Sequence, residues 1–327
     1  MIPSESPSLL ARRSLHERFD ADKGVRYRAR KQLKWLAQGD KTPPETLVLL
    51  ISEGPLVSRR LAAQNPRTPP NALVQADSRL ISEVAANPSL PPSRVSQLAK
   101  DLAWTVRAAV AANPGITPEL LGVLAGDDVV GVRSVVAANE VATKAVLTRL
   151  SGDVSDVVVS RVAQNRATPP RVLDELAANP NVWVRVGVAM NPATPTRVLT
   201  KMATDPNWQV RVGVAANPNT PNNTLGVLAR DTDPQVRSRI ALNPSLPQAA
   251  LTALEGDTDV GVRLALASNP GCSPTVLDDL ARVGATKVQR QVAKNPSASV
   301  GTLQWLARSR KPKVARVASR VLATKTV

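Results

Sequence analysis

Lysine and arginine are the residues of this chain with the most distinctive chemistry, because they gather at its two ends. Residues 1–41 contain ten Lys and Arg against five Asp and Glu, and residues 282–327 contain eleven Lys and Arg and no acid. Residues 42–281 hold 21 basic and 21 acidic residues. Basic ends on a chain of net charge +16 favour a polyanionic partner, most often nucleic acid. The alternative interpretation is that the charges only keep the ends of the fold soluble.

Three groups of cations are candidates for contacts to phosphates. The first group contains Arg26, Arg28, Arg30, Lys31 and Lys34. The second contains Arg282, Lys287, Arg290, Lys294, Arg308, Arg310, Lys311, Lys313, Arg316 and Arg320. The third is the pair Arg161 and Arg239, which interrupt a column of mostly small or apolar residues and are candidates for lining a groove.

The sequence contains no residue pattern typical of a catalytic site. His16 is the only histidine and Cys272 the only cysteine, so no catalytic triad, zinc site or disulfide can form within the chain. The 16 glycines are scattered, and no phosphate-binding glycine loop is present. We therefore predict a protein that is not an enzyme and that needs no metal or cofactor. No apolar run is long enough for a membrane span, and a cytoplasmic location is expected.

Tryptophan next to arginine can stack on unpaired bases. Trp104, Trp183 and Trp208 precede a Val-Arg pair, and Asp101 and Asp205 lie three residues before Trp104 and Trp208. A helical-repeat DNA glycosylase that uses a Trp and an Asp is therefore a remote alternative. We favour a packing role for these tryptophans.

The elements that position these residues are copies of one repeat. An asparagine marks each copy, and from Asn87 onward the copies are 26 residues apart. The marker positions are Asn65, Asn87, Asn113, Asn139, Asn165, Asn191, Asn217, Asn243, Asn269 and Asn295. A fixed period of this length indicates stacked supersecondary units.

Each copy predicts two short helices. Around Asn217, Val210 and Val214 form one apolar stripe, and Leu225 and Leu228 form another. We expect Asn217 to end the first helix in a left-handed conformation, with the following proline preventing continuation. A Thr-Pro pair, as at 220–221, is expected to begin the second helix, with Thr as its N-cap.

An Asp followed six residues later by an Arg recurs in the repeats, as in Asp205 and Arg211. One interpretation is an arginine stripe for phosphates. We favour a structural ladder, in which each Asp caps a helix and pairs with an Arg of its own or a neighbouring repeat.

The repeated pattern V-R-x-x-V-A-x-N-P-x-T-P-x-x-x-L-x-x-L-A resembles the leucine-rich repeat variant (LRV) family, over nearly the whole chain. The resemblance implies alternating α- and 3₁₀-type helices in a right-handed superhelical α-solenoid, related in style to HEAT-type repeats. It implies no single activity. Some LRV proteins carry an N-terminal iron–sulfur cluster held by cysteines, and Cys272 alone cannot provide one.

We therefore predict an all-α solenoid with four segments. Residues 1–24 are expected to be flexible, and 25–38 to form a basic cap helix with Leu33, Trp35 and Leu36 against the first repeat. Residues 39–308 form the repeat array, and 309–327 a basic cap and tail. The predicted function is a binding scaffold for nucleic acid, as duplex DNA, held by its phosphates. The alternative is a protein-interaction scaffold, whose concave face holds an acidic or helical protein partner.

Overall fold

Helices account for all regular structure in the part of the chain that can be described. The computed structural model describes residues 6–19, 22–243 and 247–325. Within these ranges it has 24 α-helices, one 3₁₀ helix and no strand, which confirms the all-α fold class. The chain divides into two compact units, Met1–Ala167 and Thr168–Val327, which we call the N-terminal and C-terminal units.

The elements of the two units follow one another without long connections. The N-terminal unit contains α1 (Pro7–Glu17), α2 (Lys23–Gln38), α3 (Pro44–Glu53), α4 (Leu56–Gln64), α5 (Pro70–Val74), η1 (Ser78–Leu80), α6 (Ile81–Ala85), α7 (Pro92–Leu98), α8 (Trp104–Ala111), α9 (Pro118–Leu124), α10 (Val130–Ala138), α11 (Lys144–Leu150) and α12 (Asp156–Gln164). The C-terminal unit contains α13 (Pro170–Leu176), α14 (Val182–Met190), α15 (Thr196–Met202), α16 (Trp208–Ala216), α17 (Asn222–Leu228), α18 (Pro234–Ala241), α19 (Gln248–Leu254), α20 (Val260–Ser268), α21 (Pro274–Val283), α22 (Thr286–Val292), α23 (Val300–Ala307) and α24 (Pro312–Lys325).

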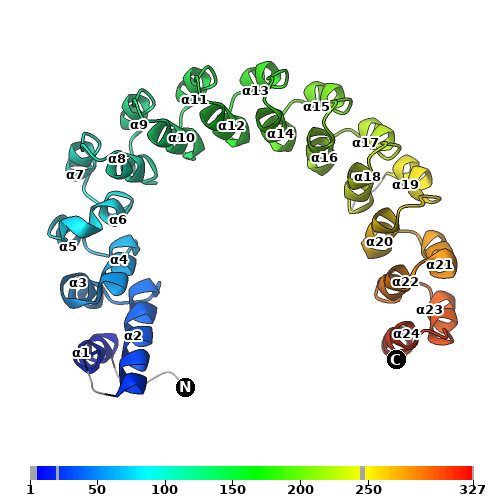
Figure 1. Cartoon of the computed structure of the whole chain (residues 1–327), viewed down its shortest axis with the longest axis horizontal. Helices are drawn as coiled ribbons and strands as arrows, with labels where there is room; N and C mark the ends of the chain where they lie inside the picture. Colours follow the sequence, from blue (N-terminus) through cyan, green and yellow to red (C-terminus); the bar gives the residue numbers. More distant parts are fainter. Residues whose placement is uncertain (1–5, 20–21, 244–246, 326–327) are drawn as a thin grey trace. The chain divides into compact units, whose positions relative to one another are not determined.

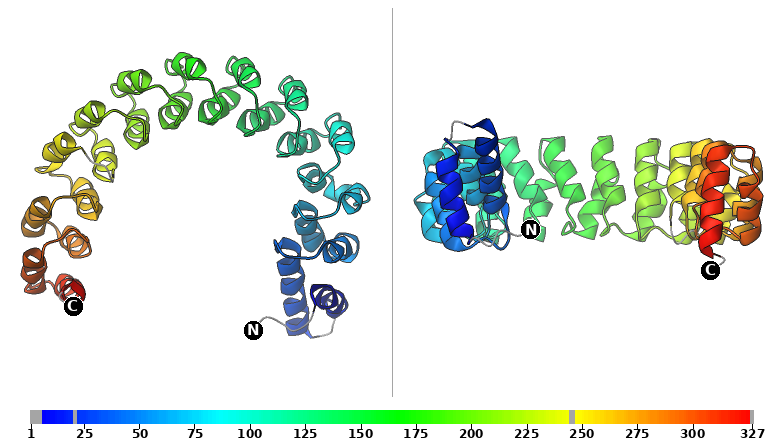
Figure 2. Two further views of the ribbon diagram at one scale, coloured as in Figure 1. Left: turned by 180° about the vertical axis from the view of Figure 1, so that it is seen from behind. Right: turned by 90° about the horizontal axis from the view of Figure 1, so that it is seen from below.

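Within each unit the helices form two rows (Figures 1 and 2). Each even-numbered helix packs on the next even-numbered one, as α8 does on α10 and α18 on α20. The odd-numbered helices form the second row and contact one another less closely. This regular packing of each helix on the one two positions further along is typical of an α-solenoid. Both helices of a repeat are α-helical, and η1 is the one 3₁₀ helix among the described residues, so the alternation of helix types implied by the resemblance is not seen.

The repeated apolar columns form the core, as the sequence predicts. Val210 and Val214 in α16, and Leu225 and Leu228 in α17, are all buried. Helices of seven to nine residues, such as these two, are marginal alone, so their stability depends on stacking against neighbouring repeats.

The repeated asparagine has a different role from the predicted one. Asn217 ends α16 in an extended conformation (φ −74°, ψ 126°), and no described non-glycine residue has positive φ. Its side chain instead joins two repeats: Nδ2 donates to the carbonyl oxygens of Ala189 and Asn191, both at 2.8 Å, and Oδ1 accepts from the amide of Asn219 at 2.9 Å. We call this arrangement the asparagine staple. The same pair of donated bonds is made by Asn65, Asn87, Asn113, Asn165, Asn269 and Asn295.

The threonine of the Thr-Pro pair is also placed differently from the prediction. Thr220 is buried, and its hydroxyl donates to the carbonyl of Val214 at 2.6 Å. The N-cap of α17 is Pro221, one residue later. Thr220 therefore fixes the turn between the helices of its repeat, and Thr194 does the same with Val188. Thr117 and Ser273 do cap the helices that follow them, as predicted.

The two ends of the chain are more ordered than the sequence suggested. Residues 7–17, predicted to be flexible, form α1, whose Leu10, Ala11 and Leu15 are buried against α2 and α3. The prediction was wrong here because it weighed the charges and prolines above this apolar face. Residues 1–5 and 20–21 of that segment lie outside the described residues. In α2, Leu36 is buried as expected, as is Leu33, but Trp35 is 62% exposed and does not pack as expected.

The last helix, α24, closes the C-terminal unit against α22 and α23. Val314 and Ala318 form its buried face. At its end Lys325 donates from Nζ to the carbonyls of Pro296 at 2.7 Å and Ala298 at 2.8 Å. These bonds attach the end of α24 to the turn that precedes α23.

Candidate nucleic-acid interface

The arginines in the middle of the chain are held in ion pairs between successive repeats. Arg211 contacts Asp231 through Nε (2.6 Å to Oδ2) and Nη2 (2.8 Å to Oδ1), and its Nη1 donates to the carbonyl of Asp205 at 2.8 Å. Asp231 in turn accepts from the amide of Asp233. Equivalent pairs are Arg107–Asp127, Arg133–Asp153, Arg185–Asp205 and Arg237–Asp257. We call them the arginine ladder.

The ladder therefore pairs each Arg with an Asp of the next repeat. The sequence had left open whether the partner belongs to the same repeat or to a neighbouring one. The Asp holds the turn before the helix and is not its N-cap, which lies two residues further on, at Asp233 in the case of Asp231. Both partners are largely buried: the side chains of Arg211 and Asp231 are 14% and 7% exposed. Arginines engaged in this way have few donors left for phosphate.

Several carboxylates of the ladder have a lowered pKa. The hydrogen bond from Arg107 holds the pKa of Asp127 below its usual value, and the bond from Arg133 does the same for the pKa of Asp153. For Asp231, burial alone would raise the pKa, but the bond from Arg211 and the amide of Asp233 bring it below the usual value. Asp127, Asp153 and Asp231 are thus ionised partners of their arginines at neutral pH.

In contrast, most cations of the C-terminal group have no acidic partner. The exposed residues that make no ion pair within the described ranges are Lys287, Lys294, Arg308, Arg310, Lys313, Arg316 and Arg320. They lie on or next to α22, α23 and α24, three neighbouring helices of the C-terminal unit. These seven residues belong to three successive helices and the turns that follow them, and we call them together the C-terminal cluster.

Two predicted residues of this group have structural contacts instead, and a third is only partly exposed. Arg282 pairs with Asp278 at 2.9 Å, and its guanidinium lies 5.9 Å from the centre of the Trp305 ring. Lys311 donates to Oε1 of Gln289 at 3.0 Å. Arg290 is only partly exposed, and its Nε is buried without a hydrogen-bond partner among the described atoms. We exclude these three from the C-terminal cluster.

The N-terminal group lies on α2. Arg28, Arg30, Lys31 and Lys34 are exposed, whereas Arg26 is half-buried. Arg30, Lys31 and Lys34 line a cavity of about 450 Å³ together with Tyr27 and the segment 55–58 at the start of α4. This cavity was not predicted from the sequence. Its only local signal is the spacing of Tyr27, Arg30, Lys31 and Lys34, which places them on one face of a helix.

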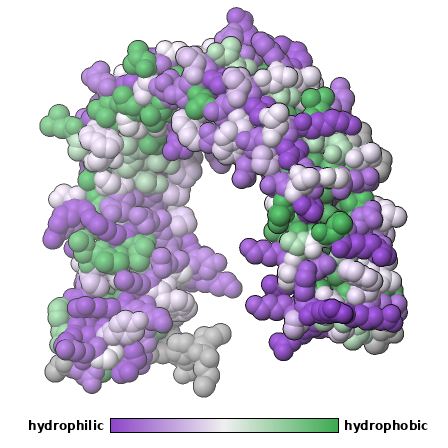
Figure 3. Space-filling view, turned by 45° about the vertical axis from the view of Figure 1, so that its right-hand side comes forward, coloured by the Kyte–Doolittle hydropathy of each residue, from purple (hydrophilic) through white to green (hydrophobic). Residues whose placement is uncertain are grey.

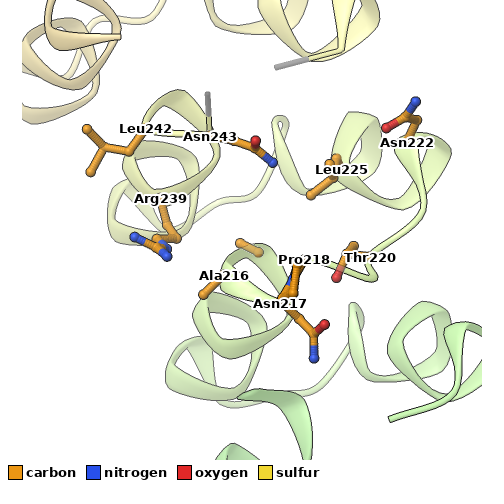
Figure 4. Close-up of a pocket in the computed structure, with 10 residues that line it drawn as sticks. Ala216, Asn217, Pro218, Thr220, Asn222, Leu225, Arg239, Leu242 and Asn243 are labelled. Carbon is orange, nitrogen blue, oxygen red and sulfur yellow. The ribbon is translucent and has the colours of Figure 1, made fainter. Parts of the chain in front are cut away.

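Arg161 and Arg239 are exposed, but they belong to different units. Arg239 lines a cavity of about 320 Å³ beside Ala216 and Asn217 (Figure 4). One repeat earlier the same column holds Gly213, where an added Cβ would lie 3.3 Å from Cγ of Met190. At this position one residue is long and its neighbour in the adjacent repeat is small: Met190 lies beside Gly213, and Arg239 lies beside Ala216. Both long side chains are exposed, so this exchange does not bury Arg239.

Trp104, Trp183 and Trp208 are exposed, at 47%, 57% and 41%, and Trp104 also packs on the next repeat. The ring of Trp104 lies over Gly131 of the next repeat, where an added Cβ would be 2.8 Å from the ring. Asp205, which precedes Trp208, is engaged by Arg185 at 2.7 Å, and Asp101 accepts the amide of Ala103. Neither acid is positioned as a free catalytic group.

Exposed hydrophobic residues lie in separate patches among hydrophilic side chains on the face that Figure 3 shows. The most exposed of the large ones are Leu102 and Val154, at 100% and 97%. Among the described residues, no helix is sufficiently long and apolar to span a bilayer. Over the same ranges, no group of three His, Cys, Asp or Glu could hold a metal ion.

The chain was compared with protein-family models, curated proteins and solved structures, and it matches solved structures. No protein-family model and no curated protein matches the sequence. A structure described as a leucine-rich repeat variant with a novel repetitive protein structural motif matches over 76% of this chain and 88% of that chain, with 25% identity and a TM-score of 0.47. This chain is similar to that leucine-rich repeat variant.

Two further solved structures match the LRV-like chain. An engineered protein matches over 97% of this chain and 99% of its own, with 17% identity and a TM-score of 0.28. A chain from the structure of Kap95p and RanGDP matches over 98% of this chain and 60% of its own, with 13% identity and a TM-score of 0.39. Because all three TM-scores lie below 0.5, these likenesses carry no statement about function.

Proposed function

We propose that this LRV-like chain is a binding scaffold for nucleic acid, as duplex DNA, which it contacts mainly through phosphates. One observation supports the proposal: the ladder pairs the middle arginines with acids, whereas the exposed cations of α2 and of the C-terminal cluster have no acidic partner among the described residues. Unpaired surface cations are those available to replace the counterions of DNA.

The mode of binding follows from the chemistry of these clusters. Exposed Lys and Arg on helix surfaces contact phosphates without reading the bases, so affinity should depend weakly on sequence and strongly on salt. We place this activity in the cytoplasm, as expected from the sequence.

The test is fluorescence anisotropy with a labelled duplex of about 30 base pairs over a series of salt concentrations. The logarithm of affinity should fall linearly with the logarithm of salt, with a slope of about −0.9 per phosphate neutralised. Neutralising Lys313, Arg316 and Arg320 together to Gln should make the slope less steep by up to about 2.7.

A control variant removes two cations that have acidic partners, against three in the cluster variant. Arg171 and Arg197 are exposed arginines of the C-terminal unit, but each has an acidic partner, Glu175 at 3.0 Å and Asp174 at 2.8 Å. Replacing both by Gln should change the slope by much less than two thirds of the change in the cluster variant, which is the ratio of the charges removed. Absence of binding at low salt would refute the proposal, and the search would turn to an acidic protein partner.

A further inference from the structure

The cavity between α2 and the start of α4, which we call the α2–α4 groove, combines cations that the proposed function uses with other features that it does not use. Its lining residues are Tyr27, Arg30, Lys31, Lys34, Pro55, Leu56, Val57 and Ser58, all of the N-terminal unit. Three of the eight are cations and none is acidic. The whole of α2 contains no Asp or Glu, so the groove has a positive wall without a neutralising partner on that helix.

The opposite wall is a helix N-terminus that lacks a capping side chain. Pro55 is the N-cap of the nine-residue helix α4, and it makes no side-chain cap hydrogen bond. The amides of Leu56, Val57 and Ser58 occupy the first turn, where no intrahelical acceptor exists. Helices α9, α21 and α23 have a Thr or Ser hydroxyl that accepts from their first turn, whereas other helices, such as α3 and α8, begin without a side-chain cap as α4 does. An uncapped N-terminus attracts an oxyanion.

Ser58 gives an independent sign of a missing ligand. Its side chain is 1% exposed, it lines the groove, and its Oγ has no hydrogen-bond partner among the described atoms. A buried hydroxyl without a partner is unfavourable, and such groups in proteins are usually satisfied by another group or by water. A phosphate oxygen in the groove would accept from this hydroxyl and from the first-turn amides.

The remaining lining is apolar and open to solvent. Tyr27 is 68% exposed, Leu56 43% and Val57 50%. A simple anion would leave this surface unused, whereas a nucleotide has a flat base next to its phosphate. Bases stack on aromatic side chains without regard to sequence.

We propose that the α2–α4 groove binds an unpaired nucleotide of a DNA strand. The phosphate lies between the α2 cations and the first turn of α4, and the base stacks on Tyr27. This inference rests on the proposed function and makes it more specific: the chain prefers DNA that exposes single-stranded nucleotides, such as an overhang, to a blunt duplex.

The test compares a blunt duplex with the same duplex carrying a three-nucleotide overhang, and with a short oligothymidylate. The intact chain should bind the overhang duplex about tenfold more tightly than the blunt one, within the range expected for stacking one base. Tyr27→Ala should remove this preference and leave blunt-duplex affinity unchanged. Ser58→Ala should weaken overhang binding without loss of stability, because it removes a hydroxyl that has no partner.

Residues of the same helix outside the groove provide matched controls. Trp35 is an exposed aromatic residue of α2 and Arg28 an exposed cation, and neither lines the groove. Trp35→Ala should keep the overhang preference that Tyr27→Ala loses. Arg28→Gln should weaken blunt and overhang duplexes equally, whereas Lys31→Gln should weaken the overhang duplex more.

The outcomes separate this inference from the proposed function. Blunt and overhang duplexes that bind equally, with no effect of Tyr27→Ala, would refute the inference and leave duplex binding intact. Binding of oligothymidylate that depends on Tyr27, with no binding of blunt duplex, would support the inference and refute the duplex proposal. Displacement of the overhang duplex by a glutamate-rich peptide of equal charge, as effective as oligothymidylate, would show that the groove takes an acidic protein segment and would refute the inference.

Discussion

Replacing Asn217 tests whether the repeated asparagine acts as a staple between repeats or as a residue chosen for its backbone conformation. The side chain is 4% exposed and makes three hydrogen bonds, two to carbonyls of the preceding repeat and one from the amide of Asn219. At about 0.5–1.5 kcal/mol net for each bond, Asn217→Ala should lower the free energy of unfolding by roughly 1.5–4.5 kcal/mol.

Glycine distinguishes the two explanations. A left-handed helix end would favour Gly over Asn, because Gly adopts positive φ without strain. Residue 217 has extended backbone, so Asn217→Gly should lose the staple and cost at least as much as Asn217→Ala. The exposed Asn222 is a control, and Asn222→Ala should change stability by less than about 0.5 kcal/mol.

The assay is urea denaturation followed by circular dichroism, combined with hydrogen exchange. Hydrogen exchange is needed because a repeat array can unfold in parts, and protection should fall mainly in α14 to α17. A glycine variant as stable as the unmodified chain would refute the staple and restore the left-handed interpretation.

Three further predictions concern the ladder and the packing of neighbouring repeats. Asp231→Asn should lower the free energy of unfolding by about 1.5–3 kcal/mol, measured by urea denaturation, because it removes a charged partner of Arg211; an unchanged midpoint would contradict this. The folded-state pKa values of Asp127, Asp153 and Asp231 lie below their unfolded value near 3.9. The ladder's contribution to stability is therefore fully present above the unfolded pKa and is lost as pH falls through the folded pKa, so the midpoint temperature of thermal unfolding should decrease below about pH 4. Asp231→Asn should show a smaller decrease, and a decrease as large as that of the unmodified chain would contradict the role of the ladder. Gly213→Val should destabilise by about 1–3 kcal/mol through overpacking, and Met190→Ala should restore part of the loss in a double-mutant cycle; additive effects would show that the two positions do not share space.

The proposed binding sites could be predicted from the sequence only in part. The sequence located the cations of α2 and of the last helices, because charge is a property of composition. It did not separate the exposed Arg316 from Arg282, which Asp278 and Trp305 engage. It also did not bring Ser58 to α2, since those residues meet only when two helices pack.

The sequence by itself determined the repeat, the helix pairs and the buried columns. A period of 26 residues with valine and leucine at helical spacing leaves few other ways to bury the apolar side chains. In most copies an Asn-Pro step likewise ends the first helix, because proline cannot continue it, whereas α10 and α12 end at an Asn without a following proline.

Tertiary structure alone decided which groups the polar columns bind. Arg211 and Asp231 are 20 residues apart, and Asn217 and Ala189 are 28 apart. Whether such groups meet depends on how one repeat is placed on the next, and local propensity does not contain that information. The same placement buries the ladder, leaves the C-terminal cluster without an ion pair among the described residues and forms the α2–α4 groove.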